Sequence, residues 1–314
     1  MELNPESEPL LNKEEREYDS YIKIRDLENK QKSKEQILNK NCYDPLEFIF
    51  FCCIDYDVTQ RQYDNFIALR DKCIIPFEDG NQNHEKILLD YFQNIKKLLP
   101  NDDEEGYEII DDKKNKENEL DKNNDLIKTL SKRIGFQSDN PRTDFRAGGL
   151  FSLEFMNYFI TNYKIESKNI LSEHNFPFSI VCINLCFKIC LILYLTEKEK
   201  NQKSLESANL KGCSRKEIKH FCEHLENDNE KDLMFLIVSQ CLCFVFSKYM
   251  KEFDNIEKDQ NIFNINSIIN ITLEYLKKTL NRVKKNENLV EKLKYELEQA
   301  KNIKIKNEGK SKLN

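Results

Sequence analysis

The chain has 314 residues, of which 39% are hydrophobic and 33% charged, and its net charge is −6. This length suggests one large or two small domains, and the acidic balance excludes a general nucleic-acid binder, which needs a basic face. The N-terminal residues, Met-Glu-Leu-Asn-Pro-Glu, lack the basic and apolar regions of a signal peptide, so we expect a cytoplasmic protein.

The N-terminal part predicts a polar tail followed by helices. Residues 1–40 are charged, with apolar residues too scattered to cover a core, which indicates a disordered tail. Phe48–Ile54 is apolar and is the first segment expected to be part of the core. It predicts a helix, although an uninterrupted apolar run of this length can also form a strand. Tyr63–Cys73 and His84–Leu99 carry apolar residues at spacings of three and four, and Pro76–Asn83 forms a turn between these two helices.

A polar stretch separates these helices from the next ones. Residues 101–124 are mostly Asp, Glu, Lys and Asn, which predicts a low-complexity insertion. Leu150–Tyr163 is an apolar helix for which Ser152 is the expected N-cap, with Glu154 favourably placed in its first turn. A short helix at Glu166–Leu171 follows.

Two long apolar runs predict the most buried helices, at residues 179–195 and 232–250. Each run contains a lysine, Lys188 in the first and Lys248 in the second. A membrane-spanning helix needs about 20 apolar residues with almost no charge. We therefore expect two core helices and no transmembrane segment.

The C-terminal third continues the helical pattern. Glu197–Asn209 is polar and predicts a loop, whereas residues 214–225 predict a helix. Ile265–Ile305 keeps helical spacing with a break at Asn286–Asn288. We expect this stretch to pack on the core at first and then to extend outward, and a short coiled coil or partner-binding helix from Leu289 is the alternative.

No alternating strand pair, hairpin or repeat is evident, so the sequence predicts an all-α fold. The expected organisation is a single helical domain at 41–260, which includes the insertion, followed by an amphipathic helix and polar tail at 261–314. The cysteines at 182, 186 and 190 recur on one face of an apolar helix. Such cysteines behave as small hydrophobic residues in a reducing compartment.

One cluster has the residue types of a metal site. Its members are Cys213, His220, Cys222 and His224. Two histidines one helical turn apart can chelate zinc, but the overall spacing matches no familiar closed zinc site. We therefore interpret all four as ordinary helix positions and predict no metal.

The most informative segment is the run Ile134–Gln137, Asn140–Arg146 and Gly148–Leu150. Three of the seven glycines and one of the seven prolines fall within 15 residues there. These residues fix unusual backbone geometry, and an arginine displayed on a loop beside a buried helix indicates a functional surface. The run resembles the signature of the ELMO domain, which reads Ile-Gly-Phe-Gln, then Asp-Pro-x-Thr-Asp-Phe-Arg-Gly-x-Gly, then a Leu-rich helix ending in Tyr-Phe.

The resemblance is strongest from Ile134 to Phe159 and extends more weakly over residues 60–255. His84-Glu85 before Leu88-Leu89 resembles the upstream helix of the family. The chain departs from the pattern at three positions: the family has tryptophan near Ser131, aspartate at Asn140 and glycine at Ala147.

The resemblance implies an ELMO-domain protein of the short type, a GTPase-activating protein for an Arf-family GTPase in vesicle trafficking. Arg146 would be the arginine supplied to the GTP-bound partner, without a cofactor and with transient membrane association through that partner. The chain has no Walker A motif, so the hydrolysis would belong to the GTPase. The alternative is a non-catalytic scaffold that binds a small GTPase or an exchange-factor partner.

Each signature residue also has a structural interpretation. Arg146 could pair with Asp144 or cap backbone carbonyls, and Gln137 could contact the partner or brace the loop. Arg142 is expected to be solvated or part of the partner-facing rim. The predicted partner-binding set is Gln137, Arg142, Asp144, Gly148 and Gly149.

Overall fold

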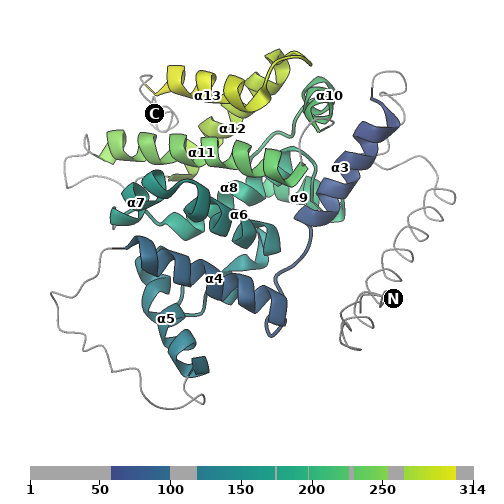
Figure 1. Cartoon of the computed structure of the whole chain (residues 1–314). Helices are drawn as coiled ribbons and strands as arrows, with labels where there is room; N and C mark the ends of the chain where they lie inside the picture. Colours follow the sequence, from purple (N-terminus) through teal and green to yellow (C-terminus); the bar gives the residue numbers. More distant parts are fainter. Residues whose placement is uncertain are drawn as a thin grey trace, which may run out of the picture. The chain divides into compact units, whose positions relative to one another are not determined.

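The computed structural model of the chain describes residues 58–99, 119–173, 175–196, 198–225, 230–253 and 265–301 (Figure 1). Contacts divide the chain into Met1–Asp55, which lies outside these residues, and Tyr56–Asn314, to which everything below refers. The described residues form helices and no strand, which confirms the all-α prediction. The predicted tail at 1–40 and the apolar segment Phe48–Ile54 fall outside the described residues.

The described residues form a series of helices in chain order. They are α3 (Gln60–Cys73), α4 (Gln82–Leu98), α5 (Glu119–Arg133), the short 3-10 helix η2 (Pro141–Arg146), α6 (Gly149–Asn162), α7 (Lys164–Ser172), α8 (Phe178–Ile192), α9 (Lys198–Ser207), α10 (Arg215–His224), α11 (Glu230–Phe253), α12 (Ile265–Arg282) and α13 (Leu289–Ala300).

The core lies where α6, α8 and α11 pack against one another. α8 is apolar on nearly all sides and is buried along most of its length, as expected for a helix surrounded by others. The two predicted core helices are therefore confirmed, and α6 is as deeply buried as they are. The cysteines of α8 at positions 182, 186 and 190 are free and buried, and burial raises the pKa of the Cys182 thiol.

One described helix has the length and composition to cross a membrane, over Glu230–Lys251. Of its most apolar stretch, 67% is buried inside the structure. The helices that pack against α11 are α12, α13, α8, α3 and α6. The core helix of a helical domain passes the same test of length and hydropathy. Lys248, one of the three lysines in this span, is only 3% exposed and lies 5.9 Å from the centroid of the Phe244 ring.

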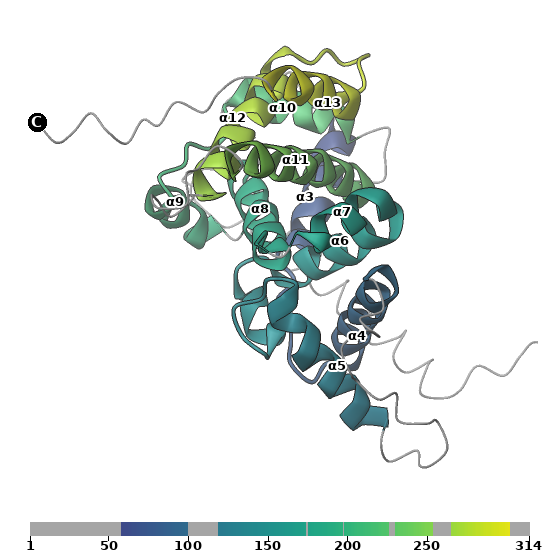
Figure 2. The same cartoon turned by 90° about the vertical axis from the view of Figure 1, so that its left-hand side faces the viewer.

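Helices α12 and α13 cover α11 on one side, while α4 and α5 lie at the opposite end of the helix stack (Figures 1 and 2). Asn288 caps α13 by accepting hydrogen bonds from the N–H groups of Val290 and Glu291, so the predicted break is confirmed. The predicted outward extension is wrong, because α13 packs back on α11 and α12 through a buried apolar face.

Two segments predicted to lack structure are helical. α5 begins at Glu119, inside the predicted insertion, because Ile127 and Leu130 bury one face of a polar helix; residues 100–118 lie outside the described residues. α9 occupies most of the predicted loop at Glu197–Asn209 and packs against α8, with Leu205 as its buried anchor. Polarity alone does not prevent a helix when its residues are good helix formers.

Candidate functional site

The signature run connects α5 to α6 and is fixed first at its Ile134-Gly135 end. The N–H of Ser179 donates to the Ile134 carbonyl at 2.9 Å, and the N–H of Ile180 donates to the Gly135 carbonyl at 3.3 Å. Gly135 has a φ angle of +86°, and a Cβ there would lie 2.5 Å from the Cα of Pro177. The loop therefore lies directly on the N-terminus of α8, at a position that only glycine can occupy.

The two phenylalanines of the run anchor it in the core. Phe136 is 5% exposed and Phe145 1% exposed, and their ring centroids are 5.8 Å apart. Phe136 stacks on Phe92 of α4, and Phe145 contacts Phe77 at 5.2 Å. Two large aromatic residues inside a polar loop are the sequence signal for such anchors, because side chains of this kind are usually buried.

Polar contacts close the loop between these anchors. The Gln137 backbone N–H donates to Asp144 Oδ2 at 2.8 Å, while the Gln137 residue itself is exposed. Asn140 accepts from the Arg142 N–H at 3.3 Å and so begins η2. Asp144 therefore braces the loop. Of the two structural alternatives for Arg146, the structure shows the cap on a backbone carbonyl, that of Thr143, and not the pairing with Asp144.

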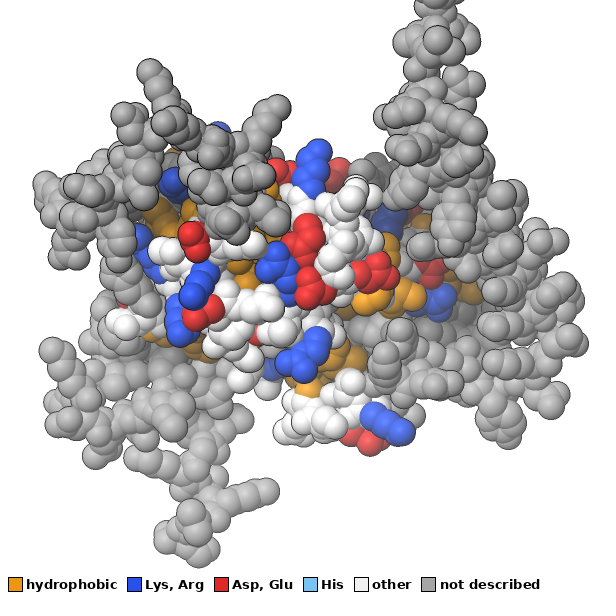
Figure 3. Space-filling view, turned by 90° about the horizontal axis from the view of Figure 1, so that it is seen from below, with side chains coloured by type: hydrophobic (Ala, Val, Ile, Leu, Met, Phe, Trp, Pro, Cys, Tyr) orange, Lys and Arg blue, Asp and Glu red, His pale blue; other side chains and the backbone are white. Residues whose placement is uncertain are grey.

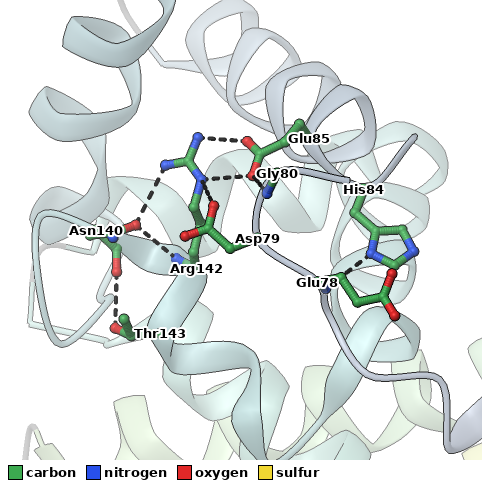
Figure 4. Close-up of polar contacts among 8 residues, drawn as sticks. All are labelled: Glu78, Asp79, Gly80, His84, Glu85, Asn140, Arg142 and Thr143. Atoms are coloured by element: carbon green, nitrogen blue, oxygen red, sulfur yellow. Dashed lines mark hydrogen bonds and ion pairs between the residues drawn. The ribbon is translucent and has the colours of Figure 1, made fainter. Parts of the chain in front are cut away.

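Arg142 is held inside the chain by two acidic residues (Figure 4). Its Nε donates to Glu85 Oε1 at 2.8 Å and its Nη2 to Glu85 Oε2 at 2.6 Å, while Asp79 lies 3.5 Å from Nε. The Arg142 side chain is only 19% exposed. The interpretation of Arg142 as a solvated side chain is wrong, because a bidentate carboxylate lies across from it on α4.

Arg146 stands in contrast to Arg142. It is exposed, and its Nε donates to the Thr143 carbonyl at 2.9 Å. Across the described part of the chain, its two terminal nitrogens have no hydrogen-bond or ion-pair partner. Residues of a 3-10 helix are spaced about 120° apart, so two side chains four residues apart point in different directions. One arginine of η2 is thus held by α4, and the other is displayed to solvent.

The model of the ELMO/CED-12 family matches residues 67–269, nearly two-thirds of the chain. The chain belongs to the ELMO/CED-12 family. The matched region contains the whole loop described above, including both of its arginines.

Several curated proteins are similar to part of the chain. ELMO domain-containing protein 2 of Mus musculus is 35% identical over 142 residues, which cover 43% of this chain and 39% of that protein. The human protein of the same name is 47% identical over 57 residues, 17% of this chain and 20% of that protein. ELMO domain-containing protein B of Dictyostelium discoideum is 36% identical over 69 residues, 21% of this chain and 23% of that protein.

The chain thus spans about two-fifths of the length of the mouse relative and about a fifth of the human one. No solved structure shows a significant similarity to it.

The departures from the ELMO signature leave the loop geometry intact. Ala147 has a φ of −87° and a ψ of −47°, a region open to every residue, so no glycine is required there. Asn140 caps η2 through its side-chain oxygen, as an aspartate would. Ser131, near the position of the family tryptophan, is fully buried, and its hydroxyl donates to the Ile127 carbonyl at 2.6 Å.

Gly148 and Gly149 follow Arg146 and are buried. A side chain at either position would collide with its neighbours, so close packing explains why glycine is present. α6 begins at Gly149 with Gly148 as its N-cap, so Ser152 is not the N-cap that the sequence predicted. Ser152 lies inside the helix, and its hydroxyl donates to the Gly149 carbonyl at 2.9 Å. Gly149 has a φ of +56°, and the neighbouring Leu150 N–H donates to the Ile75 carbonyl at 2.9 Å. A role for either glycine in partner binding stays a prediction.

We expect Gly149→Ala to destabilise the ELMO domain more than Gly80→Ala does. Both glycines have positive φ angles, +56° and +79°, which cost an alanine about 1–2 kcal/mol. Only at Gly149 would the new Cβ also lie 2.4 Å from the Ile75 carbonyl oxygen, whereas nothing lies within 4 Å at Gly80. Urea unfolding of the two variants measures the difference, and equal losses would contradict this account of the loop.

The cluster of metal-like residues does not converge. His220 Nδ1 lies 2.6 Å from the Leu280 carbonyl oxygen, and Cys213 and Cys222 are both buried. Among the described residues, no group of three or more His, Cys, Asp or Glu side chains could hold a metal ion.

Proposed function

We propose that this protein is a GTPase-activating protein for an Arf-family small GTPase, and that Arg146 enters the partner's active site. The observation that carries the proposal is the contrast within η2. Arg142 makes a bidentate ion pair with Glu85, whereas Arg146 is exposed and its two terminal nitrogens have no partner among the described residues. The hydrogen bond to the Thr143 carbonyl is the backbone cap that the structural interpretation predicts, but it occupies only Nε of Arg146.

The chemistry of GTP hydrolysis suits this arginine. The partner GTPase positions water for attack on the γ-phosphate, and negative charge spreads over the phosphate oxygens as the bond to GDP breaks. A guanidinium inserted from outside neutralises that charge with two parallel N–H donors. The hydrogen bond from Arg146 Nε to the Thr143 carbonyl orients the side chain. It leaves both terminal nitrogens available to donate to the phosphate oxygens.

The surroundings of Arg146 fit contact with a folded partner. Gln137, Thr143 and Ala147 are exposed in the same loop. The segment Ile75-Pro76, which lies against Gly149, is exposed as well and adds apolar surface. On the described face below α4 and α5, basic and acidic side chains alternate without a patch of one sign (Figure 3). We propose that recognition depends on this local surface, in the cytoplasm or at a membrane reached through the GTPase.

The test is single-turnover hydrolysis of GTP by a panel of purified Arf-family GTPases, with and without this protein. At least one GTPase should be accelerated by about 10³- to 10⁵-fold, the range that trans-acting arginines supply. If a GTP-loaded GTPase binds the protein and no member of the panel is accelerated, the proposal fails and a scaffold function replaces it.

A further inference from the structure

We infer that the ion pair between Glu85 of α4 and Arg142 of η2 positions Arg146 for its action on the partner. The inference rests on the proposed function and adds to it two positioning residues that do not themselves reach the partner's nucleotide. Arg142 and Arg146 belong to the same six-residue helix. A contact that holds Arg142 in place therefore also sets the orientation of η2 and, with it, the direction of the Arg146 side chain.

The contact joins distant parts of the chain. Glu85 and Arg142 are 57 residues apart, and both oxygens of the carboxylate are used, at 2.8 Å and 2.6 Å (Figure 4). Asp79 adds a second negative charge 3.5 Å from Arg142 Nε. The two side chains are 19% and 26% exposed, so water screens the pair less than it would at the open surface.

Glu85 is itself firmly placed. Asn81 caps α4 by accepting from the N–H groups of Asn83 and His84, and the Glu85 N–H donates to the Asn81 carbonyl at 2.9 Å. The His84 ring accepts from the Glu78 N–H, which closes the preceding turn (Figure 4). Below this first turn, α4 buries Leu88, Tyr91 and Phe92. The carboxylate that holds Arg142 therefore stands on a rigid part of the core.

Other contacts hold η2 when the ion pair is lost. Phe145 is buried, Asn140 caps the helix and Asp144 braces Gln137. The ion pair is thus not needed for the loop to fold, and its contribution is orientation. A displacement of about 1 Å at a catalytic group can lower a rate by about 100-fold, so a small rotation of η2 would be visible in activity.

Both partners stay charged at neutral pH. Burial raises the pKa of the Glu85 carboxyl, but the hydrogen bond and charge of Arg142 outweigh this and leave it below its ordinary value. The hydrogen bond from Arg142 to Glu85 raises the pKa of the guanidinium. Because the folded pKa of Glu85 is lowered, the small stability that the pair adds is present above the ordinary glutamate pKa of about 4.3 and is lost as the pH falls further.

We test the inference with Glu85→Gln, which keeps the shape and removes the charge. The maximal stimulated rate should fall by about 10- to 100-fold, with the affinity for the GTP-loaded GTPase and the melting temperature nearly unchanged. In an Arg142→Gln background the same substitution should have no further effect, since coupled residues are not additive. Asp90→Asn on the same helix is the matched control and should behave as wild type. Independent, additive losses would overturn the inference.

A second measurement does not depend on activity. The Nε–H groups of Arg142 and Arg146 can be followed in proton–nitrogen NMR spectra of the whole chain. In Glu85→Gln, the Arg142 Nε–H should exchange faster with solvent and the Arg146 Nε–H resonance should move. If the Arg146 resonance is unchanged, the inference is wrong whatever the kinetics.

The two proposals can fail separately. If wild type accelerates no GTPase, the proposed function fails, and the NMR measurement alone decides whether the ion pair orients Arg146. If Arg146→Lys abolishes stimulation and Glu85→Gln does not lower it, the proposed function stands and the positioning role is rejected.

Discussion

Arg146→Lys should abolish nearly all stimulation of GTP hydrolysis while the fold and partner binding are retained. A lysine keeps the positive charge but replaces the planar fork of N–H donors with a single point charge. Arginines supplied in trans contribute about 10³ to 10⁵ in rate, or roughly 4–7 kcal/mol. Against this, Arg146 loses only one exposed hydrogen bond, from its Nε to the Thr143 carbonyl, which contributes about 0.5–1.5 kcal/mol to stability.

The measurement combines single-turnover hydrolysis, binding to the GTP-loaded GTPase and thermal unfolding. Arg142 is unsuitable as the control because Arg142→Lys breaks a bidentate ion pair. Arg282→Lys is suitable: Arg282 is 58% exposed on α12, at the other end of the helix stack from α4, and its ion pair with Glu296 is made through Nη1 alone, at 3.6 Å. If Arg146→Lys stimulates as well as wild type, Arg146 is not catalytic. If it lowers stability and binding together, its role is structural.

Ile183→Asp should prevent folding of the domain. Ile183 is 1% exposed in α8, and a Cβ on Gly148 would lie 3.3 Å from its Cγ2, so the site loop rests on this side chain. An unpaired charge buried there costs several kcal/mol, a large part of the roughly 5–15 kcal/mol that stabilises a native domain. Circular dichroism and thermal unfolding should show loss of the cooperative transition.

The matched control is Ile165→Asp. Ile165 in α7 is 76% exposed, so the same chemical change should alter the free energy of unfolding by no more than about 0.5 kcal/mol. A melting temperature of Ile183→Asp close to that of wild type would mean that the burial of α8 is wrong.

The sequence was most predictive where apolar spacing determines the structure. The core helices α8 and α11 and the break before α13 follow from their apolar patterns and from Asn288. Helix α9 is not predictable from the sequence, because its single leucine, Leu205, cannot form a pattern of apolar residues at helical spacing. The N-cap of α6 was misplaced because a serine near a helix start resembles a cap, whereas Gly149 begins the helix three residues earlier.

The site was predictable only in part. Arg146 and the glycines could be found because they lie in one short motif with a family resemblance. The partner of Arg142 could not be found, because nothing in the sequence says which of many carboxylates lies opposite an arginine. From the sequence, Glu85 is only part of an upstream helix that resembles the family. The contact between Glu85 and Arg142 depends on a fold that brings residues 57 positions apart together.

The signature loop touches three other regions of the chain, at Ile75, Glu85 and Ser179. A synthetic peptide of residues 134–149 would contain every motif residue and none of these contacts, so it should be inert even at high concentration. Grafting the loop onto another scaffold should fail for the same reason. The motif that identifies the family in sequence is thus not a transferable module, and any minimal active fragment must include at least residues 75–180.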